Sequence, residues 1–316
     1  MAERKIVTVF GATGAQGGGL ARSLLADRDG GWSVRAVTRD ESSPAARSLA
    51  RAGAELVRAD LDDAASVERA LEGAYGAYFV TFFWAHFSPE RELAEARTMA
   101  DAARRAGVRH AIWSTLEDTR RWIPLDDPRM PTLMGRYKVP HFDAKGEGDQ
   151  YFRDAGVPTT FLLTSFYWDN LIHFGMGPKP GADGQLEFVL PMGGAQMPGI
   201  AAEDIGRCAH GILGRGDELV GRTVGIAGEH LSGAEMAAAL GRALGRPVRH
   251  ADVPPEVYRG FGFPGAEDLG NMFQFYRDCE RDFRAARSVE FSRELNPALQ
   301  SFGQWLAANA ARIPVA

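Results

Sequence analysis

A glycine-rich turn between an apolar run and a helical pattern constrains the fold of this chain more than any other feature. Residues 5–10 read KIVTVF, a continuous apolar and β-branched run that is typical of a strand buried on both faces. The turn GATGAQGG follows at 11–18, and a helix is predicted from about residue 16 to residue 27. Gly11 permits the tight turn, Gly14 lets the backbone approach a ligand, and Gly17 lets the helix pack closely. Because free N–H groups at a helix start favour an anion, the turn predicts a dinucleotide diphosphate site.

The alternation of strand and helix signals continues through the first 165 residues. Strands are expected at 33–38, 54–60, 77–81, 110–115 and 159–164, and helices at 44–53, 64–71, 89–106 and 142–155. This order predicts an α/β fold, a Rossmann-type doubly wound parallel sheet covered by helices, with a second, smaller, mostly helical C-terminal domain. We expect 1–165 to form the NAD(P)-binding domain, with 201–230 returning to it. The smaller substrate or partner domain is expected from 166–200, which contains a hairpin, and 231–316.

Composition narrows the functional classes. The 316 residues carry 36 Lys and Arg against 41 Asp and Glu, a formal charge of −5, with no basic block. Such a chain is a poor general binder of nucleic acid or of an anionic membrane. No apolar run is long enough for a membrane span, and residues 1–10 lead straight into a strand, so we expect neither an anchor nor a signal peptide. Cys208 and Cys279 lie far apart, without metal-ligand spacing, which favours a reducing cytoplasm.

Two strand ends carry residues suited to the adenosine half of a dinucleotide. The second strand ends in Arg39 and Asp40. An Arg here accommodates the 2′-phosphate of NADP, whereas an acidic residue bonds the ribose of NAD, so we favour NADP(H) with Arg39 as its reader. The alternatives are that Arg39 is a solvated surface charge or that Asp40 turns inward. After the third strand, Asp60 is expected to accept from the adenine amino group while Leu61 covers the ring; the alternative is that Asp60 caps the next helix.

Several segments together resemble the NmrA-like family of atypical short-chain dehydrogenases. They are the opening strand with GATGAQGG, VTRD at 37–40, ADLDD at 59–63, HFDAKGEGDQYFRDAGVP at 141–158, FYWDN at 166–170 and GFPGAEDL at 262–269. The resemblance spans nearly the whole chain and is closest to the NADP(H)-sensing members. It implies a Rossmann domain, a small helical domain and NAD(P) between them. Several members of that family are redox-state sensors that contact regulatory or metabolic proteins, and the isoflavone-reductase-like branch consists of reductases.

The resemblance also implies which residues hold the cofactor. Thr13, Gln16 and Gly17 would touch the pyrophosphate, and residues 80–82 would line the cofactor path. Lys145 would reach the nicotinamide ribose. The full expected set is Gly11, Thr13, Gly14, Ala15, Gln16, Gly17, Arg39, Asp60, Leu61, Val80, Thr81, Phe82, Lys145, Tyr167 and Asn170, the last two near the nicotinamide. These residues lie at or beyond strand carboxyl ends, where open α/β sheets bind ligands.

A departure at one position leaves catalysis open. The usual dehydrogenase site has a Tyr four residues before a Lys, but here His141 stands four residues before Lys145. Tyr137 lies one turn earlier, and Pro140 disfavours a continuous helix between them. Because the Tyr is missing, we favour a redox sensor that binds NADP(H) without turnover and changes the long connection at 117–140. The alternative is an NADPH-dependent reductase in which Lys145 or His141 is the catalytic proton donor to a small-molecule substrate.

Weaker features complete the expectations. Residues 81–87, TFFWAHF, form either an aromatic wall beside the nicotinamide or a packing surface between the domains. Ser114 is expected to make a hydrogen bond at its strand end. His86 is interpreted as a structural or surface histidine, and the other histidines show no HxxxH or HxH grouping, so no metal site is expected. Apolar residues within 269–276 are candidates for a contact with a protein partner or with a second copy of the chain.

Overall fold

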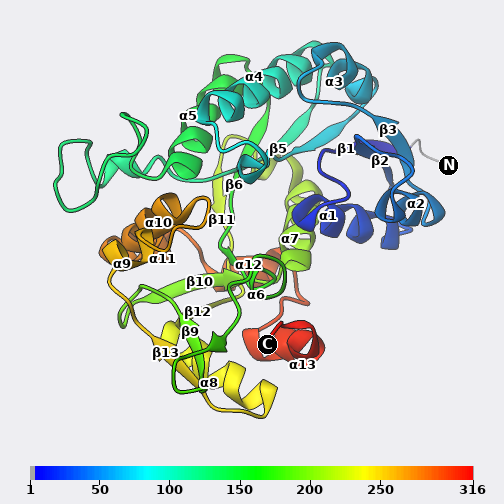
Figure 1. The fold of residues 1–316 in the computed structure, drawn as a ribbon. Helices are drawn as coiled ribbons and strands as arrows, with labels where there is room; N and C mark the ends of the chain where they lie inside the picture. Colours follow the sequence, from blue (N-terminus) through cyan, green and yellow to red (C-terminus); the bar gives the residue numbers. More distant parts are fainter. Residues whose placement is uncertain (1–3, 316) are drawn as a thin grey trace.

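The computed structural model describes residues 4–315 and is built around one sheet of parallel strands (Figure 1). In spatial order the strands are β11 (Thr223–Gly225), β6 (Thr159–Leu163), β5 (His110–Thr115), β4 (Gly76–Phe79), β1 (Lys5–Val9), β2 (Trp32–Thr38) and β3 (Glu55–Arg58). All neighbouring pairs are parallel, and Val9 lies opposite Ala36 on one side and Tyr78 on the other. The strand order reverses between β1 and β4, where sheets of this kind bind ligands at their carboxyl ends. The predicted doubly wound α/β sheet is confirmed.

Helices cover both faces of this sheet, which is why its central strands β4 and β5 are buried along their whole length. One face packs against α1 (Ala15–Ala26), α2 (Pro44–Arg51) and α7 (Ala202–Arg215), and the other against α3 (Ala64–Leu71), α4 (Pro89–Arg105) and α5 (Pro140–Asp154) (Figure 1). α7 lies so close to α1 that a Cβ on Gly206 would sit 2.0 Å from the backbone nitrogen of Leu20. Residues 202–225, which contain α7 and β11, therefore return to the main sheet. In the described part of the chain, no helix has the length and apolar character needed to cross a membrane.

Two helix starts follow the proline signals of the sequence. Pro44 is the first residue of α2, and the hydroxyl of Ser43 accepts from the N–H of Ala46 at 3.3 Å. Pro140 is the first residue of α5. Proline suits this position because the N–H that it lacks would have no partner inside the helix. Tyr137 therefore lies in the preceding loop and not on the helix of His141, as predicted.

The C-terminal region adds two small sheets and a set of short helices around a second core. One sheet contains β7 (Phe166–Tyr167), β10 (Gln196–Ile200) and β12 (Glu229–Ser232), and the other contains β8 (Lys179–Pro180), β9 (Leu186–Val189) and β13 (Val248–Ala251). β8 and β9 pair antiparallel and form the predicted hairpin. The helices are α6 (Asn170–His173), α8 (Gly233–Leu244), α9 (Pro255–Arg259), α10 (Ala266–Asp278), α11 (Glu280–Ala285), α12 (Val289–Leu295) and α13 (Phe302–Asn309). Leu295 of α12 packs into the core of the main sheet, so residues after 231 contribute to both cores.

The long connection between β5 and α5 bridges the two parts. It contains one short helix, η2 (Thr119–Arg121). Ile123 and Met130 are buried in the second core. Asn271 on α10 donates its side-chain N–H groups to the carbonyls of Pro131 at 2.9 Å and Lys138 at 2.6 Å. The segment at 117–140 is thus tied to α10 by both packing and hydrogen bonds (Figure 1).

Candidate functional site

The turn between β1 and α1 depends on glycine at two points. Gly11 has φ +64°, a left-handed conformation, and a Cβ there would lie 2.8 Å from Cγ1 of Val80 beyond β4. A Cβ on Gly17 would lie 2.5 Å from the carbonyl oxygen of Gly11 and 2.8 Å from that of Phe10. A Cβ atom does not approach backbone atoms this closely without a shift, so the first turn of α1 rests on the end of β1 only with glycine at 17.

The start of α1 is suited to an anion. Gly14 is the N-cap residue and offers no capping side chain, and no acidic residue lies in the first turn. Thr13, Gly14 and Ala15 are exposed, whereas the strand before them and the helix after them are buried. The N–H groups of the first turn and the positive end of the helix dipole therefore meet an open surface, the arrangement that binds phosphate. The residues present fit the diphosphate of a dinucleotide, because the helix start is exposed, has no capping side chain and carries no acidic residue in its first turn.

Gln16 has its side chain in a polar cluster formed by three strands. Its amide oxygen accepts from the hydroxyls of Tyr78 and Ser114, the latter at 2.8 Å, and its amide nitrogen donates to the hydroxyl of Tyr167. Burial raises the pKa of Tyr167 to about 12 and raises that of Tyr78 as well. Ser114 thus makes the hydrogen bond expected at its strand end. Gln16 can meet a diphosphate through its backbone N–H, and neither phenol is a ready proton donor at neutral pH.

At the end of β2 the two candidate readers of the ribose differ in their availability. The carboxylate of Asp40 accepts from the N–H of Ser42 at 2.8 Å and from its hydroxyl at 2.6 Å. These hydrogen bonds to Ser42 lower the pKa of Asp40. Asp40 is therefore engaged in its own turn, while Arg39 beside it is exposed. This geometry favours Arg39 as the residue that meets a ligand.

At the end of β3 the helix cap is a different aspartate from the candidate adenine contact. Asp63 is the N-cap of α3, and its carboxylate accepts from the N–H groups of Ala65 and Ser66. Asp60 is exposed and accepts from the N–H of Asp62 at 3.1 Å, and Leu61 beside it is half-buried. Asp60 is thus not needed as the cap of α3, which was the alternative to an adenine contact.

The remaining expected cofactor residues lie just after β4, in β7 and after β7. Val80 covers Gly11, Thr81 is buried, and Phe82 is 55% exposed. Tyr167 reaches Gln16, whereas Asn170 begins the short helix α6 and is half-buried. The structure therefore brings the end of β4 and Tyr167 to the glycine turn.

Lys145 on α5 is held at the end of β4 by a buried ion pair. Its Nζ lies 2.7 Å from Oε1 of Glu92 on α4 and donates to the hydroxyl of Thr81, which in turn donates to Glu92. Lys145 is 9% exposed and Glu92 is fully buried. Burial alone would raise the pKa of Glu92, but Lys145, with contacts from His86 and Thr81, lowers it to about 2. Glu92 is therefore charged at neutral pH, and Lys145 is its counter-ion.

His141 lies one helical turn before Lys145 and is held by a carboxylate from the C-terminal region. Its Nδ1 is 2.5 Å from Oδ1 of Asp268 on α10, and its backbone N–H donates to Oδ2 of the same carboxylate at 3.2 Å. The ring centroid of Trp84, in the short helix η1 (Phe83–Ala85), lies 4.7 Å from that of the imidazole. His141 and Asp268 are both 6% exposed. The imidazole thus sits where α5, α10 and the segment after β4 meet.

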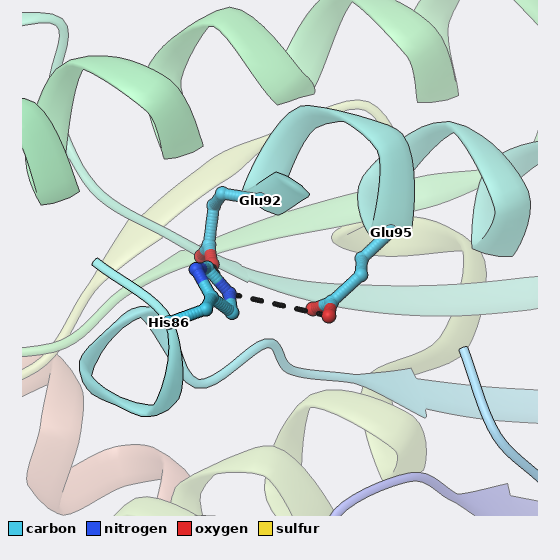
Figure 2. Close-up of side chains that lie close together, drawn as sticks. All are labelled: His86, Glu92 and Glu95. Carbon is cyan, nitrogen blue, oxygen red and sulfur yellow. Dashed lines mark ion pairs between the residues drawn. The ribbon is translucent and has the colours of Figure 1, made fainter. Parts of the chain in front are cut away.

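Two further titratable side chains, those of His86 and Glu95, lie beside Glu92 (Figure 2). Nε2 of His86 is 3.5 Å from Oε2 of Glu92 and 4.0 Å from Oε1 of Glu95, which is also on α4. The three ligand atoms lie within 4.8 Å of one another, a spacing that a metal ion requires. Burial and the charge of Glu92 raise the pKa of Glu95.

The hydrogen bond on the other side of the His86 ring argues against a metal. The backbone N–H of Ser88 donates to Nδ1 at 3.0 Å, so the ring proton lies on Nε2 and faces the carboxylates. A metal ligand needs the lone pair of that nitrogen. Glu92 is already paired with Lys145, and Glu95 with Arg91 at 3.3 Å. The group is better described as a polar support for Glu92.

Sequence reasoning missed Glu92 and Asp268, and only one of them left a signal. Glu92 occupies the buried stripe of α4 that continues with Ala96, Met99 and Ala103, at spacings of four and three. A carboxylate on an apolar helix face needs a buried partner, so this position could have been singled out. Asp268 is separated from His141 by 127 residues, and no local pattern links the two.

Comparisons with known proteins agree with this geometry. The pattern of the NmrA-like family matches residues 3–306. The NmrA-like family domain-containing oxidoreductase FrzB of Cladobotryum sp is 31% identical over 292 residues, which cover 85% of this chain and 83% of that protein. The NAD(P)H azoreductase of Xenophilus azovorans is 28% identical over 312 residues, 97% of this chain and 98% of that protein.

Among solved structures, that of NmrA, a negative transcriptional regulator, has a TM-score of 0.79 at 25% identity and covers 96% of this chain and 95% of its own. NmrA has also been solved in complex with NADP and with NAD. The fold is therefore an NAD(P)-binding fold. By the extent of the family match and by the likeness to oxidoreductases along nearly its whole length, this chain belongs to the NmrA-like family.

Proposed function

We propose that the protein is an NADPH-dependent reductase of small electron-poor substrates. The observation that carries this proposal is the presence of two proton-bearing side chains, Lys145 and His141, one turn apart on α5 beside the end of β4. This edge of the sheet also carries the glycine turn, so a dinucleotide held there would present its nicotinamide end toward them. The names of the relatives, which include oxidoreductases and an NAD(P)H azoreductase, support the same conclusion.

Within this proposal the chain's own residues bind and orient the cofactor. The N–H groups at the start of α1 hold the diphosphate, Arg39 holds the 2′-phosphate, and Asp60 with Leu61 flanks the adenine. The exposed guanidinium of Arg39, next to an Asp40 engaged elsewhere, supports NADPH over NADH. When bound, the reduced nicotinamide supplies a hydride.

At the other end, the residues around α5 arrange the reacting groups. Lys145, fixed by Glu92 and Thr81, offers its remaining donor capacity to the nicotinamide ribose. Aromatic side chains of η1 and the exposed Phe82 form an apolar boundary that limits water. The missing Tyr of the usual dehydrogenase site, which favoured a sensor on sequence grounds, is thus offset by a buried histidine at its position.

Single-turnover oxidation of NADPH tests the proposal. The purified protein is mixed with NADPH and a panel of carbonyl, quinone and azo acceptors, and the loss of nicotinamide absorbance is followed. Wild type is expected to oxidise NADPH with at least one acceptor, and Lys145→Met to bind NADPH more weakly and to react more slowly. Lys179→Met, at an exposed lysine of β8, is the matched control and should behave as wild type. Tight NADPH binding without oxidation of any acceptor would refute the reductase and favour a sensor.

A further inference from the structure

The carboxylate of Asp268 satisfies two donors of His141 at once. One oxygen faces the ring Nδ1 at 2.5 Å, and the other accepts the backbone N–H at 3.2 Å. That N–H belongs to the first turn of α5 and has no acceptor inside its own helix. An ionised carboxylate only accepts hydrogen bonds, so Nδ1 carries a proton. Both donors need an acceptor oxygen. A carboxylate offers two such oxygens, whereas a side-chain amide offers one.

This arrangement determines which nitrogen of His141 is available for chemistry. With Nδ1–H directed to Asp268, the second nitrogen, Nε2, is the atom that gains and loses a proton. Among residues 4–315, Nε2 takes part in no hydrogen bond or ion pair of the side chain, and 8% of the side chain is exposed. Trp84 packs on the ring and limits its rotation. The geometry therefore holds an oriented imidazole with one free nitrogen beside the end of β4.

Lys145 is less suited to donate a proton. Its Nζ forms an ion pair at 2.7 Å with the fully buried Glu92, whose pKa of about 2 keeps the carboxylate charged. Loss of the ammonium proton would leave that buried carboxylate without a counter-ion, which is unfavourable. The ion pair suits a lasting charge that orients a ligand, whereas the imidazole of His141 has a free ring nitrogen through which a proton can be transferred.

We propose that His141 is the proton donor of the reductase and that Asp268 is its positioning residue. This inference rests on the proposed function and adds the identity of the acid. The acceptor gains two electrons with the hydride and is left with one extra negative charge. Nε2–H of the imidazolium breaks and a new bond to hydrogen forms on the acceptor, so His141 ends as the neutral Nδ1–H tautomer. Solvent then restores the proton. In total the acceptor gains two electrons and two protons, one proton with the hydride and one from His141.

The acid is assembled from both parts of the molecule. His141 lies in the first turn of α5, which packs on the main sheet, and Asp268 lies in the first turn of α10 in the C-terminal region (Figure 1). α10 also holds the 117–140 connection through Asn271. A Cβ on Gly265, just before α10, would lie 2.8 Å from Trp84, so α10 is seated directly against η1. Proton donation therefore requires the C-terminal region to be docked on the sheet.

Two variants separate the proposed role from a structural one. In Asp268→Asn, the single amide oxygen cannot accept from both donors of His141, so either the ring or the backbone N–H loses its acceptor. When the amide nitrogen faces Nδ1, the ring proton moves to Nε2. In His141→Asn, the amide nitrogen replaces Nδ1 and keeps the bond to Asp268, but no atom replaces Nε2. Asp278→Asn, on the same helix and with the same change of charge, is the control.

The experiment combines nitrogen-15 spectra of the histidines with single-turnover oxidation of NADPH. In mildly alkaline buffer, wild type and Asp278→Asn are expected to show His141 as the Nδ1–H tautomer, and Asp268→Asn as the Nε2–H tautomer. Both Asp268→Asn and His141→Asn are expected to lose about 100-fold in rate, the contribution of a general acid, with NADPH affinity within about twofold of wild type.

The outcomes separate this inference from the proposed function. Turnover by wild type together with an undiminished rate in His141→Asn refutes the acid role alone. An Nε2–H tautomer in wild type refutes the positioning role of Asp268, and so does an Asp268→Asn variant that keeps both the wild-type tautomer and the wild-type rate. A wild type that binds NADPH and reduces no acceptor refutes the reductase and the acid role together, while the spectra still decide whether Asp268 orients the ring.

Discussion

Replacing Gly17 with alanine tests the nucleotide turn where its geometry is tightest. The added Cβ would lie 2.5 Å from the carbonyl oxygen of Gly11, about 0.9 Å inside the 3.4 Å at which ordinary contact begins. Both sides of the contact are backbone, so no side chain can move away. α1 cannot slide outward either, because a Cβ on Gly19 would already lie 2.9 Å from the carbonyl oxygen of Glu203 on α7. The helix is confined between the end of β1 and α7.

The size of the effect follows from this confinement. Adding a methyl group to a closely packed site typically costs about 1–3 kcal/mol, and the better helix propensity of alanine returns roughly 0.5–1 kcal/mol. We expect Gly17→Ala to lower the free energy of unfolding by about 1–2 kcal/mol. A shift of the first turn also moves the N–H groups that would hold the diphosphate, and a loss of 1–3 kcal/mol in binding corresponds to a roughly 5- to 150-fold weaker affinity for NADPH.

The assay pairs denaturant unfolding with calorimetric titration of NADPH, and Gly214→Ala is the matched control. Gly214 lies in α7 with nothing within 4 Å of its added Cβ, so alanine there should stabilise the protein by roughly 0.5–1 kcal/mol and leave NADPH binding unchanged. Unchanged NADPH affinity in a destabilised Gly17→Ala would mean that the diphosphate binds elsewhere. Unchanged stability would refute the steric argument itself.

Three further predictions follow from the structure. Arg39→Ala should weaken NADPH binding by roughly 10- to 100-fold and leave NADH binding unchanged, since a charged hydrogen bond contributes about 1.5–3 kcal/mol; equal losses for both in calorimetry would contradict the assignment. Glu92→Gln should lower the free energy of unfolding by about 3 kcal/mol at neutral pH, because the pKa of Glu92 is about 2 in the folded protein against an ordinary value of 4.5. The stabilisation from this lowered pKa is complete above pH 4.5 and is lost as the pH falls toward 2. Urea unfolding at decreasing pH should therefore show a shrinking difference in stability between wild type and the variant. Asp149→Asn should stabilise the folded protein by roughly 1–3 kcal/mol at neutral pH, because burial raises the pKa of Asp149 from 3.8 to about 6. The stability that comes from the protonated carboxyl is complete below pH 3.8 and is lost as the pH rises through 6, whereas the amide oxygen of Asn can still accept from Trp113 and Thr115. No gain in stability at neutral pH in the same unfolding assay would count against this reasoning.

Much of the main sheet was predictable because its signals are local. Residues 7–10 of the first run and all of HAIWST at 110–115 are buried, and a parallel strand under helices leaves no polar alternation to misread. Pro140 separated Tyr137 from the helix of His141 as predicted, but α5 begins at Pro140 itself, two residues before the predicted start, since a residue without an N–H fits the first helical turn. For the C-terminal region the sequence predicted only a hairpin within 166–200 and an otherwise mostly helical structure. Its strands β7, β10 and β12 are two to five residues long, too short for a periodic pattern.

The candidate site also has a part that local sequence predicted and a part that only the structure revealed. The glycine turn, and Arg39 as the favoured reader of the 2′-phosphate, were predicted from short stretches of adjacent residues. The hydrogen bonds between Asp40 and Ser42 became visible only in the structure. The side chain of Gln16 illustrates the limit. The family resemblance implied a contact between Gln16 and the diphosphate, but tertiary packing brings Tyr78, Ser114 and Tyr167 around its side-chain amide. A buried polar side chain forms hydrogen bonds with the groups that tertiary packing places beside it, and these groups cannot be predicted from the local sequence.

What the sequence by itself determined is the strand–turn–helix that can hold a diphosphate, because backbone conformation and the absence of a Cβ at Gly11 and Gly17 are properties of adjacent residues. What only the tertiary structure decided is the chemistry at the other end of the site. Lys145 meets Glu92 across 53 positions of sequence and His141 meets Asp268 across 127, each pair brought together by helix packing. The strength of these pairs comes from their burial, and burial is a property of the assembled fold rather than of any segment.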